Sequence, residues 1–258
     1  MTADQQFVNP RRLRHIVIIV VLLLPLLPPR AGAESSQIRF GTFDLPPYAL
    51  HARGDGRRGM LRDFNAAVAK HAGLTHIDRI MPLKRIHKEL VKGGVACSTF
   101  IPAAWSKRDL IQVAEITANV DSIVVPKKGL AVRRLQDLYG LTIATPRGSY
   151  HGMDIMTDPK IKRVLTNGYN QSAAILRAGR VDAMVGSDIA VYHSLRAAGV
   201  AKVDIGRPFV FLKLPLWLQC RRDVDPGHIE SLRRAARQLR AEGAFENIRA
   251  QYTSGYTE

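Results

Sequence analysis

The chain has few residues in the patterns that catalysis or metal binding requires. Its eight histidines show no metal-ligand spacing, since the closest pair, His71 and His76, does not share a helical face. It also lacks a G-x-S-x-G nucleophile elbow. Residues 54–59 spell G-x-G-x-x-G, but this motif follows a Pro-Pro-Tyr loop instead of a strand, which argues against a dinucleotide site. The residue types therefore predict no cofactor and no metal centre.

Two cysteines, Cys97 and Cys220, are a further source of chemistry. In an oxidising compartment they could form a disulfide, and otherwise they would be two buried free thiols. The residues alone leave both possibilities open.

The first 33 residues have the parts of a secretory signal peptide. A basic segment at 11–15 precedes an apolar run of 12 residues at 16–27, and small residues follow at 31–33. The run contains Pro25 and is shorter than the roughly 20 residues that a membrane-spanning helix needs. We therefore expect a cleaved signal peptide, a periplasmic mature protein and no stable membrane insertion.

The chain is strongly basic, with a formal net charge of +16. Removing residues 1–33 takes away four arginines and one aspartate, which lowers the charge to +13. The remaining lysines and arginines are scattered singly or in pairs and form no stripe, so nucleic acid is not expected as a partner. The charge is interpreted as an aid to solubility, to docking on an acidic partner or to attraction of an anionic ligand.

One sequence segment, among the elements that would position a site, occurs twice in similar form. Residues 87–99 and 173–185 both read as the end of a helix, a glycine and a buried strand. Gly93 and Gly179 are expected to close these helices in the left-handed conformation. Two such units predict two α/β lobes, which commonly hold a ligand between them at the carboxyl ends of the strands.

The other expected elements follow from hydrophobic periodicity and turn residues. Strands are expected at 37–43, 95–101 and 141–145, helices at 60–72 and from 226, and crossing segments at 119–126 and 209–220.

Eight short motifs occur in a characteristic order along the chain. They are P-P-Y at 46–48, G-M-L-x-D at 59–63, P-L-x-R at 82–85, Arg108 after a strand, L-x-D-L-x-G at 135–140, G-S-Y at 148–150, G-R-V-D-A at 179–183, and L-x-x-x-G-x-x-x-x-I-x-x-x-Y at 239–252. Together they resemble the family 3 extracellular solute-binding proteins, the polar-amino-acid-type periplasmic receptors of ABC importers. The resemblance covers essentially all of residues 37–255.

The resemblance implies an α/β fold of the periplasmic-binding-protein type II (venus flytrap) class, with two lobes and two crossing hinge strands. Lobe 1 would comprise residues 34–122 and 212–258, and lobe 2 residues 123–211. The implied function is that of a monomeric periplasmic receptor. It would capture a small carboxylate-bearing solute, an amino acid or related organic acid, and deliver it to an inner-membrane ABC permease. On this topology the strands of Cys97 and Cys220 would be neighbours, which favours the disulfide.

The resemblance also implies which residues contact the ligand. Arg108 matches the family arginine that binds the ligand carboxylate, and a guanidinium offers a planar fork of donors for it; its alternative role is a surface ion pair with Asp109. The turn Gly148-Ser149-Tyr150 would add N–H groups and a hydroxyl at a helix N-terminus. The further candidates are Tyr48, Phe100, Trp105, Arg85, His87 and Asp188.

The chain departs from the family pattern where an amino acid would be held. Thr42 and Leu45 stand at positions where the family usually has an acid and a stacking aromatic, and the polar positions before the arginine fall on Phe100, Ile101 and Ala103. Ser187 stands where the acid for the α-ammonium is expected, with Asp188 one place later. A buried ammonium without a carboxylate partner is costly. A solute that lacks the ammonium, or a larger ligand, therefore fits better.

Two other functions remain open on the same fold. One is an envelope ligand sensor or accessory factor, and the other is an exported dehydratase-type enzyme. An enzyme would need a general acid or base in the cleft. The candidates are Glu115, Asp121, His151 and Asp188, none with a clear partner in the sequence.

Overall fold

The fold is seen in a computed structural model, which describes residues 37–51, 58–147, 149–150 and 152–253. The expected signal peptide, Gly148 and His151 lie outside the described residues. None of the helices in this described part of the chain has the length and hydropathy needed to cross a membrane.

A mixed eight-stranded sheet runs through the described residues in the order β2-β1-β3-β8-β4-β7-β5-β6. The strands are β1 (Gln37–Phe43), β2 (Thr75–Met81), β3 (Cys97–Phe100), β4 (Leu110–Pro126), β5 (Thr142–Pro146), β6 (Lys162–Thr166), β7 (Ala183–Ser187) and β8 (Phe209–Arg221). Strands β1, β2 and β3 pair in parallel at one end of the sheet, and β5, β6 and β7 do so at the other. The antiparallel pair β4–β8 joins the two ends.

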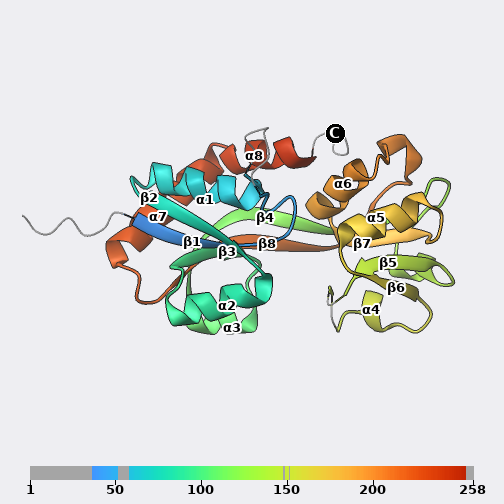
Figure 1. Ribbon diagram of the computed structural model, residues 1–258, viewed down its shortest axis with the longest axis horizontal. Coiled ribbons are helices and arrows are strands. Elements are labelled where there is room, and N and C mark those ends of the chain that lie inside the picture. Colours follow the sequence, from blue (N-terminus) through green and yellow to red (C-terminus); the bar gives the residue numbers. More distant parts are fainter. Residues whose placement is uncertain (1–36, 52–57, 148, 151, 254–258) are drawn as a thin grey trace, which may run out of the picture. The chain divides into compact units, whose positions relative to one another are not determined.

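Helices cover both faces of this sheet (Figure 1). They are α1 (Met60–His71), α2 (Leu83–Lys92), α3 (Ala104–Asp109), α4 (Asp154–Thr157), α5 (Tyr169–Arg177), α6 (Asp188–Ala197), α7 (Pro226–Ala241) and α8 (Ala244–Thr253), with short 3-10 turns η1 (Leu135–Leu138) and η2 (Lys202–Asp204). In the half that holds β1–β3, helices α1, α7 and α8 lie on one face, and α2 and α3 on the other (Figure 1).

Strands β4 and β8 pass from one hydrophobic core to another, which divides the protein into two lobes (Figure 1). Along β4, Val120 belongs to the core beneath α1 and α7, whereas Ile123 belongs to a core beneath α5 and α6. Along β8, Phe211 packs on the second lobe and Leu216 on the first. The prediction of two lobes joined by two crossing strands is confirmed.

The repeated sequence segment forms the same helix–glycine–strand unit in each lobe. Residues 87–99 contain the end of α2 and most of β3, and residues 173–185 contain the end of α5 and most of β7. Gly93 and Gly179 follow these helices with φ values of 84° and 68°, which glycine adopts without steric cost. The expected left-handed closures are therefore present in both units.

Three of the sequence motifs meet at the loop that positions Tyr48. The amide of Leu61 donates to the Tyr48 carbonyl at 3.0 Å, and the amide of Gly59 donates to the Tyr252 hydroxyl at 3.1 Å. Gly59 has φ 108°, and a Cβ there would lie 2.6 Å from the Ala49 Cα. Only glycine fits this backbone, so the start of α1 and the Tyr48 loop are held together.

The two cysteines form a disulfide between neighbouring strands. Cys97 of β3 lies opposite Cys220 of β8 in the antiparallel register, and both side chains are buried. The bond links residues 123 positions apart and ties the returning C-terminal segment to the first lobe.

Candidate ligand-binding site

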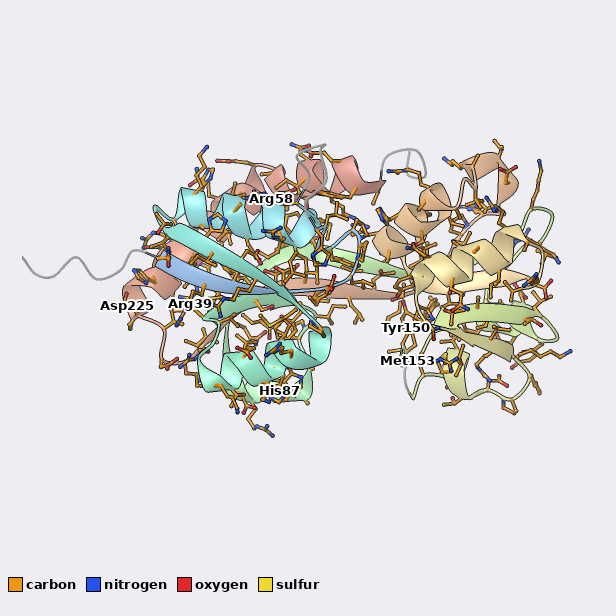
Figure 2. The ribbon with its side chains drawn as sticks, in the orientation of Figure 1. Arg39, Arg58, His87, Tyr150, Met153 and Asp225 are labelled. Carbon is orange, nitrogen blue, oxygen red and sulfur yellow. A yellow bond between two sulfur atoms is a disulfide. The ribbon has the colours of Figure 1, made fainter. Side chains whose placement is uncertain are left out.

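A cavity of about 610 Å³ lies where the two lobes meet the crossing strands. Its wall includes Tyr48 after β1, Trp105 on α3, Val120 on β4 and Tyr150 after β5. Figure 2 shows two of its lining residues on opposite lobes, His87 on α2 and Tyr150 between β5 and α4. The volume falls within the roughly 300–1,000 Å³ of small-molecule sites.

The structure brings many of the predicted ligand residues to this cavity. The predicted residues among its lining are Tyr48, His87, Phe100, Trp105, Ser149 and Tyr150. Of the six positions that depart from the family pattern, Leu45, Phe100, Ile101, Ala103 and Ser187 also line it, whereas Thr42 is buried against Asn65. The replacements noted in the sequence therefore determine the chemistry of the wall.

Aromatic rings form much of the wall on the first lobe. Trp105 stacks on Phe100 with ring centroids 5.5 Å apart and planes 14° apart, and the His87 ring lies 4.1 Å from Trp105 on its centroid. Phe43 packs against Tyr48 at 5.1 Å. The Ser106 hydroxyl accepts from the Ala103 amide at 3.0 Å, which holds the start of the short helix that carries Trp105.

The polar groups of the wall are mainly hydroxyls that hydrogen-bond to one another. Ser187 is a hydrogen-bond partner of Tyr48 and of Tyr169, and Ser122 is a partner of Tyr150. Burial raises the pKa of all three phenols above the ordinary value, so they are neutral near pH 7. The hydroxyl network thus carries no charge.

Arg108 does not line the cavity in this structure. Its side chain is 75% exposed and forms a bidentate pair with Asp109, with Nε–Oδ1 and Nη2–Oδ2 distances of 2.7 and 2.9 Å. The pair raises the pKa of the guanidinium and lowers the pKa of the carboxyl. Arg108 nevertheless shares α3 with Trp105, which does line the cavity.

Asp188 and Arg85 also lie away from the cavity lining. Asp188, only 3% exposed, begins α6, accepts from the Ile189 amide at 2.8 Å and pairs with Arg249 of α8. Arg85 is exposed and pairs with Glu89 on its own helix at 3.4 Å. Asp188 therefore pairs with Arg249 inside the protein and does not line the cavity.

The turn after β5 differs from the expectation in one respect. Ser149 and Tyr150 line the cavity, and Tyr150 has the positive φ of 53° that turns permit. The helix that follows starts only at Asp154 and has four residues. Ser149 is therefore not at a helix N-terminus, because residues 150–153 lie between it and α4.

The carboxylates named above as candidate general acids or bases do not line the cavity. Glu115 pairs with Arg240 of α7 at 2.8 Å. Asp121 lies between Val120 and Ser122 on β4, and since strand side chains alternate, it faces away from the cavity that these two neighbours line. The described residues also contain no group of three or more His, Cys, Asp or Glu placed to hold a metal ion.

Seven lining residues escaped the sequence reasoning. They are Phe43, Ile86, Val120, Ser122, Tyr169, Leu214 and Leu216. Of these, only Tyr169 could have been suspected from the sequence. Its neighbour Gly186 lies inside the strand β7, and a glycine within a strand often marks the close approach of another group. The Tyr169 ring packs directly on Gly186.

This contact predicts the effect of a single methyl group. An alanine Cβ at 186 would lie 2.1 Å from the Tyr169 Cε1 and 2.8 Å from the Val191 Cγ2. Gly186→Ala should therefore lower the free energy of unfolding by about 1–3 kcal/mol through overpacking. Denaturant unfolding measures this. Gly168→Ala is the matched control, because its Cβ meets nothing within 4 Å and its backbone is extended. Equal losses in both variants would contradict the prediction.

Known proteins resemble this one in structure, whereas no sequence match was found. The sequence matches no family model and no curated protein. An ancestral cationic amino acid solute binding protein has a similar structure, with TM-score 0.71 and 19% identity over 85% of this chain and 96% of that chain. The substrate binding protein of an amino acid ABC transporter has TM-score 0.62 and 20% identity, covering 84% and 98%. The GluR0 ligand-binding core from Nostoc punctiforme, solved with L-glutamate, has TM-score 0.64 and 14% identity, covering 83% and 98%.

These likenesses and the lobe arrangement agree with the resemblance carried by the sequence motifs. The described chain adopts the two-lobed α/β fold of the type II periplasmic binding proteins, the venus-flytrap fold found in polar-amino-acid solute-binding proteins.

Proposed function

We propose that the protein is a periplasmic receptor that captures a small organic solute between its lobes and delivers it to an ABC permease. The cavity lined from both lobes and from the crossing strands carries this proposal. Two similar structures are named as solute- or substrate-binding proteins, one of them of an ABC transporter. The basic segment and apolar run at residues 1–33 support export.

The lobes of this receptor are proposed to be residues 34–122 with 212–258, and residues 123–211. This division agrees with the change of core between Val120 and Ile123 on β4. Closure of the lobes about β4 and β8 would enclose a solute, a hinge motion that binding proteins of this kind use.

A thermal-shift screen of the mature protein tests receptor function. Ligand at 100 times its Kd stabilises a folded protein by about 2.7 kcal/mol, which raises the melting temperature by several degrees. The panel would hold amino acids, keto and hydroxy acids, aromatic acids and small peptides. A saturable shift with one class supports a receptor. No shift with any compound would count against solute capture.

The solute is proposed to carry a carboxylate, with Arg108 and Ser149 as its partners. Exposed ion pairs such as Arg108–Asp109 contribute little to stability, so a ligand carboxylate could replace Asp109 at small cost. The position of Arg108 on the helix that carries Trp105 supports this exchange.

Arg108→Ala should weaken binding of a carboxylate-bearing ligand by about tenfold or more, because a charged hydrogen bond is lost. Isothermal titration with the hit from the screen measures the change in Kd. Arg134→Ala is the control, since Arg134 is equally exposed and also pairs with an aspartate near it in sequence, Asp137, at 3.2 Å. An unchanged Kd in Arg108→Ala would remove Arg108 from the site.

A second candidate function is ligand sensing by an envelope protein. The observation that favours it is the likeness to the GluR0 protein of Nostoc punctiforme, which is a ligand-binding core and is not named as part of a transporter. A permease and an ATPase encoded beside this protein would favour the transport role.

A further inference from the structure

We propose that the solute bound in this cavity is an aromatic acid that lacks an ammonium group. The inference rests on the proposed receptor function and names the solute class that the same cavity selects. The carboxylate of this solute is the group proposed above to bind Arg108. Three features of the wall, namely its charge, its hydrogen bonding and its shape, carry the aromatic body and the absence of an ammonium.

The described lining offers no acidic partner for an ammonium group. The described residues that line the cavity include no Asp, Glu, Lys or Arg, and His87 is their one imidazole. Three acids adjoin lining residues in sequence, and none of them lines the cavity. Asp44 pairs with His51 at 3.0 Å, and Asp188 is buried against Arg249. Asp121 faces the other side of β4. A buried ammonium without an acidic partner loses its hydration, and contact with the faces of aromatic rings returns only part of that loss. An α-amino acid would pay this cost, whereas the same molecule without its amino group would not.

The hydroxyls of the wall do not require a polar ligand. Ser187 is a partner of Tyr48 and Tyr169, and Ser122 is a partner of Tyr150. Ser149, proposed above to bind the ligand carboxylate, is also a partner of Tyr169. Because these groups already have partners, an apolar ligand body beside them strands no buried donor or acceptor. Because each hydroxyl has only one hydrogen to donate, a sugar or another strongly polar solute would find few free donors among these groups.

Flat rings and aliphatic side chains complete the wall. The stack of His87, Trp105 and Phe100 lies on the first lobe, and Tyr150 comes from the second. Leu214 and Leu216 of β8 form part of the floor. Aromatic rings pair favourably in stacked or edge-on geometry with centroids about 4.5–7 Å apart, beyond the gain from burying apolar area. A ligand ring can use such contacts, and the cavity volume accommodates one or two rings.

The two tryptophans of the chain allow a direct test. Trp105 lines the cavity, whereas Trp217 lines a different groove, beside Arg233 and Arg237. In Trp217→Phe protein the remaining indole is therefore a reporter inside the cavity. Trp105→Phe is the matched control, since its remaining indole lies outside.

The probes are 3-phenylpropionate and phenylalanine, which differ only in the ammonium group. In Trp217→Phe protein, 3-phenylpropionate should change the fluorescence saturably, with a Kd at least about tenfold lower than that of phenylalanine. The Trp105→Phe protein should show no change with either compound. Calorimetry on the wild-type protein gives the same two affinities without relying on the reporter.

Different failures separate the solute class from the receptor function. Phenylalanine binding as tightly as 3-phenylpropionate would overturn the absence of an ammonium. Binding of arginine or glutamate, with neither aromatic probe bound, would overturn the aromatic class while receptor function stands. No response to any of these compounds, together with no hit in the thermal-shift screen, would overturn both proposals.

Discussion

Reduction of the Cys97–Cys220 disulfide should lower the melting temperature of the mature protein by about 10 °C. The bond joins residues 123 positions apart, so it removes much chain entropy from the unfolded state. For a loop of about this length the chain-entropy model gives a stabilisation near 5 kcal/mol, and measured losses are about 2–5 kcal/mol. A domain of this size loses roughly 2–4 °C per kcal/mol. Thermal unfolding followed by circular dichroism, with and without dithiothreitol, measures the difference.

A double variant separates the bond from the packing of its sulfur atoms. Cys97→Ala/Cys220→Ala should unfold at the same temperature with and without dithiothreitol, because it has no bond to reduce. Both positions are fully buried, so this variant also carries the cost of lost side-chain volume. A wild-type melting temperature that is unchanged in dithiothreitol, with complete reduction verified by thiol titration, would show that the bond contributes nothing to stability.

Arg249→Ala should lower the free energy of unfolding by about 3–5 kcal/mol near neutral pH, because it leaves the buried Asp188 carboxylate without its ionic partner. Asp188 begins α6, whose first turn packs on the core of the first lobe and whose later residues pack on the second. The ion pair therefore ties α6 to α8. Denaturant unfolding at several pH values measures the loss.

The loss should depend on pH with a definite sign. Burial raises the pKa of the Asp188 carboxyl, while Arg249 opposes this effect and the nearby Asp121 adds to it. An acid whose folded pKa exceeds its unfolded pKa favours the folded state when protonated, and this contribution is lost as pH rises through the folded pKa. Without Arg249 the pKa rises further. Arg249→Ala should therefore be less destabilising in acidic solution, where the carboxyl is protonated, than in neutral solution, where it is ionised.

Asp188→Asn provides the control for the pH dependence. The amide oxygen can still accept from the Ile189 amide, but it does not titrate. Arg249→Ala in the Asp188→Asn background should lose most of the extra pH dependence. The same pH profile in both backgrounds would assign the effect to another group.

Local sequence patterns were enough to predict the two lobes, because helix ends and buried strands depend on residues that are close in sequence. Gly93 and Gly179 close helices in the left-handed conformation, and the crossing strand β8 was expected at nearly its observed bounds. The first part of β4, residues 110–118, was not expected as a strand. Nor were strands β2 and β6 recognised. β2 lies at an edge of the sheet with half-exposed side chains, so it lacks the continuous apolar run that marks a buried strand.

The candidate site was predicted in part. Tyr48, Phe100, Trp105, Ser149 and Tyr150 line the cavity as individual residues. What the sequence could not supply was the set of distant partners, such as Arg249 for Asp188, 61 positions away. An ion pair of this kind depends on how α6 and α8 pack, which no local pattern encodes.

The sequence by itself determined the fold class and the departures from the family pattern, since both reside in residue types and their order. Only the tertiary structure decided which side chains share the cavity. Leu45, Ile101 and Ser187 become one wall because β1, β3 and β7 end at the same cavity. The alternation of side chains along β4 directs Val120 and Ser122 into it and Asp121 away. The chemistry of the site thus follows from sheet register and helix packing, which join residues far apart in the chain.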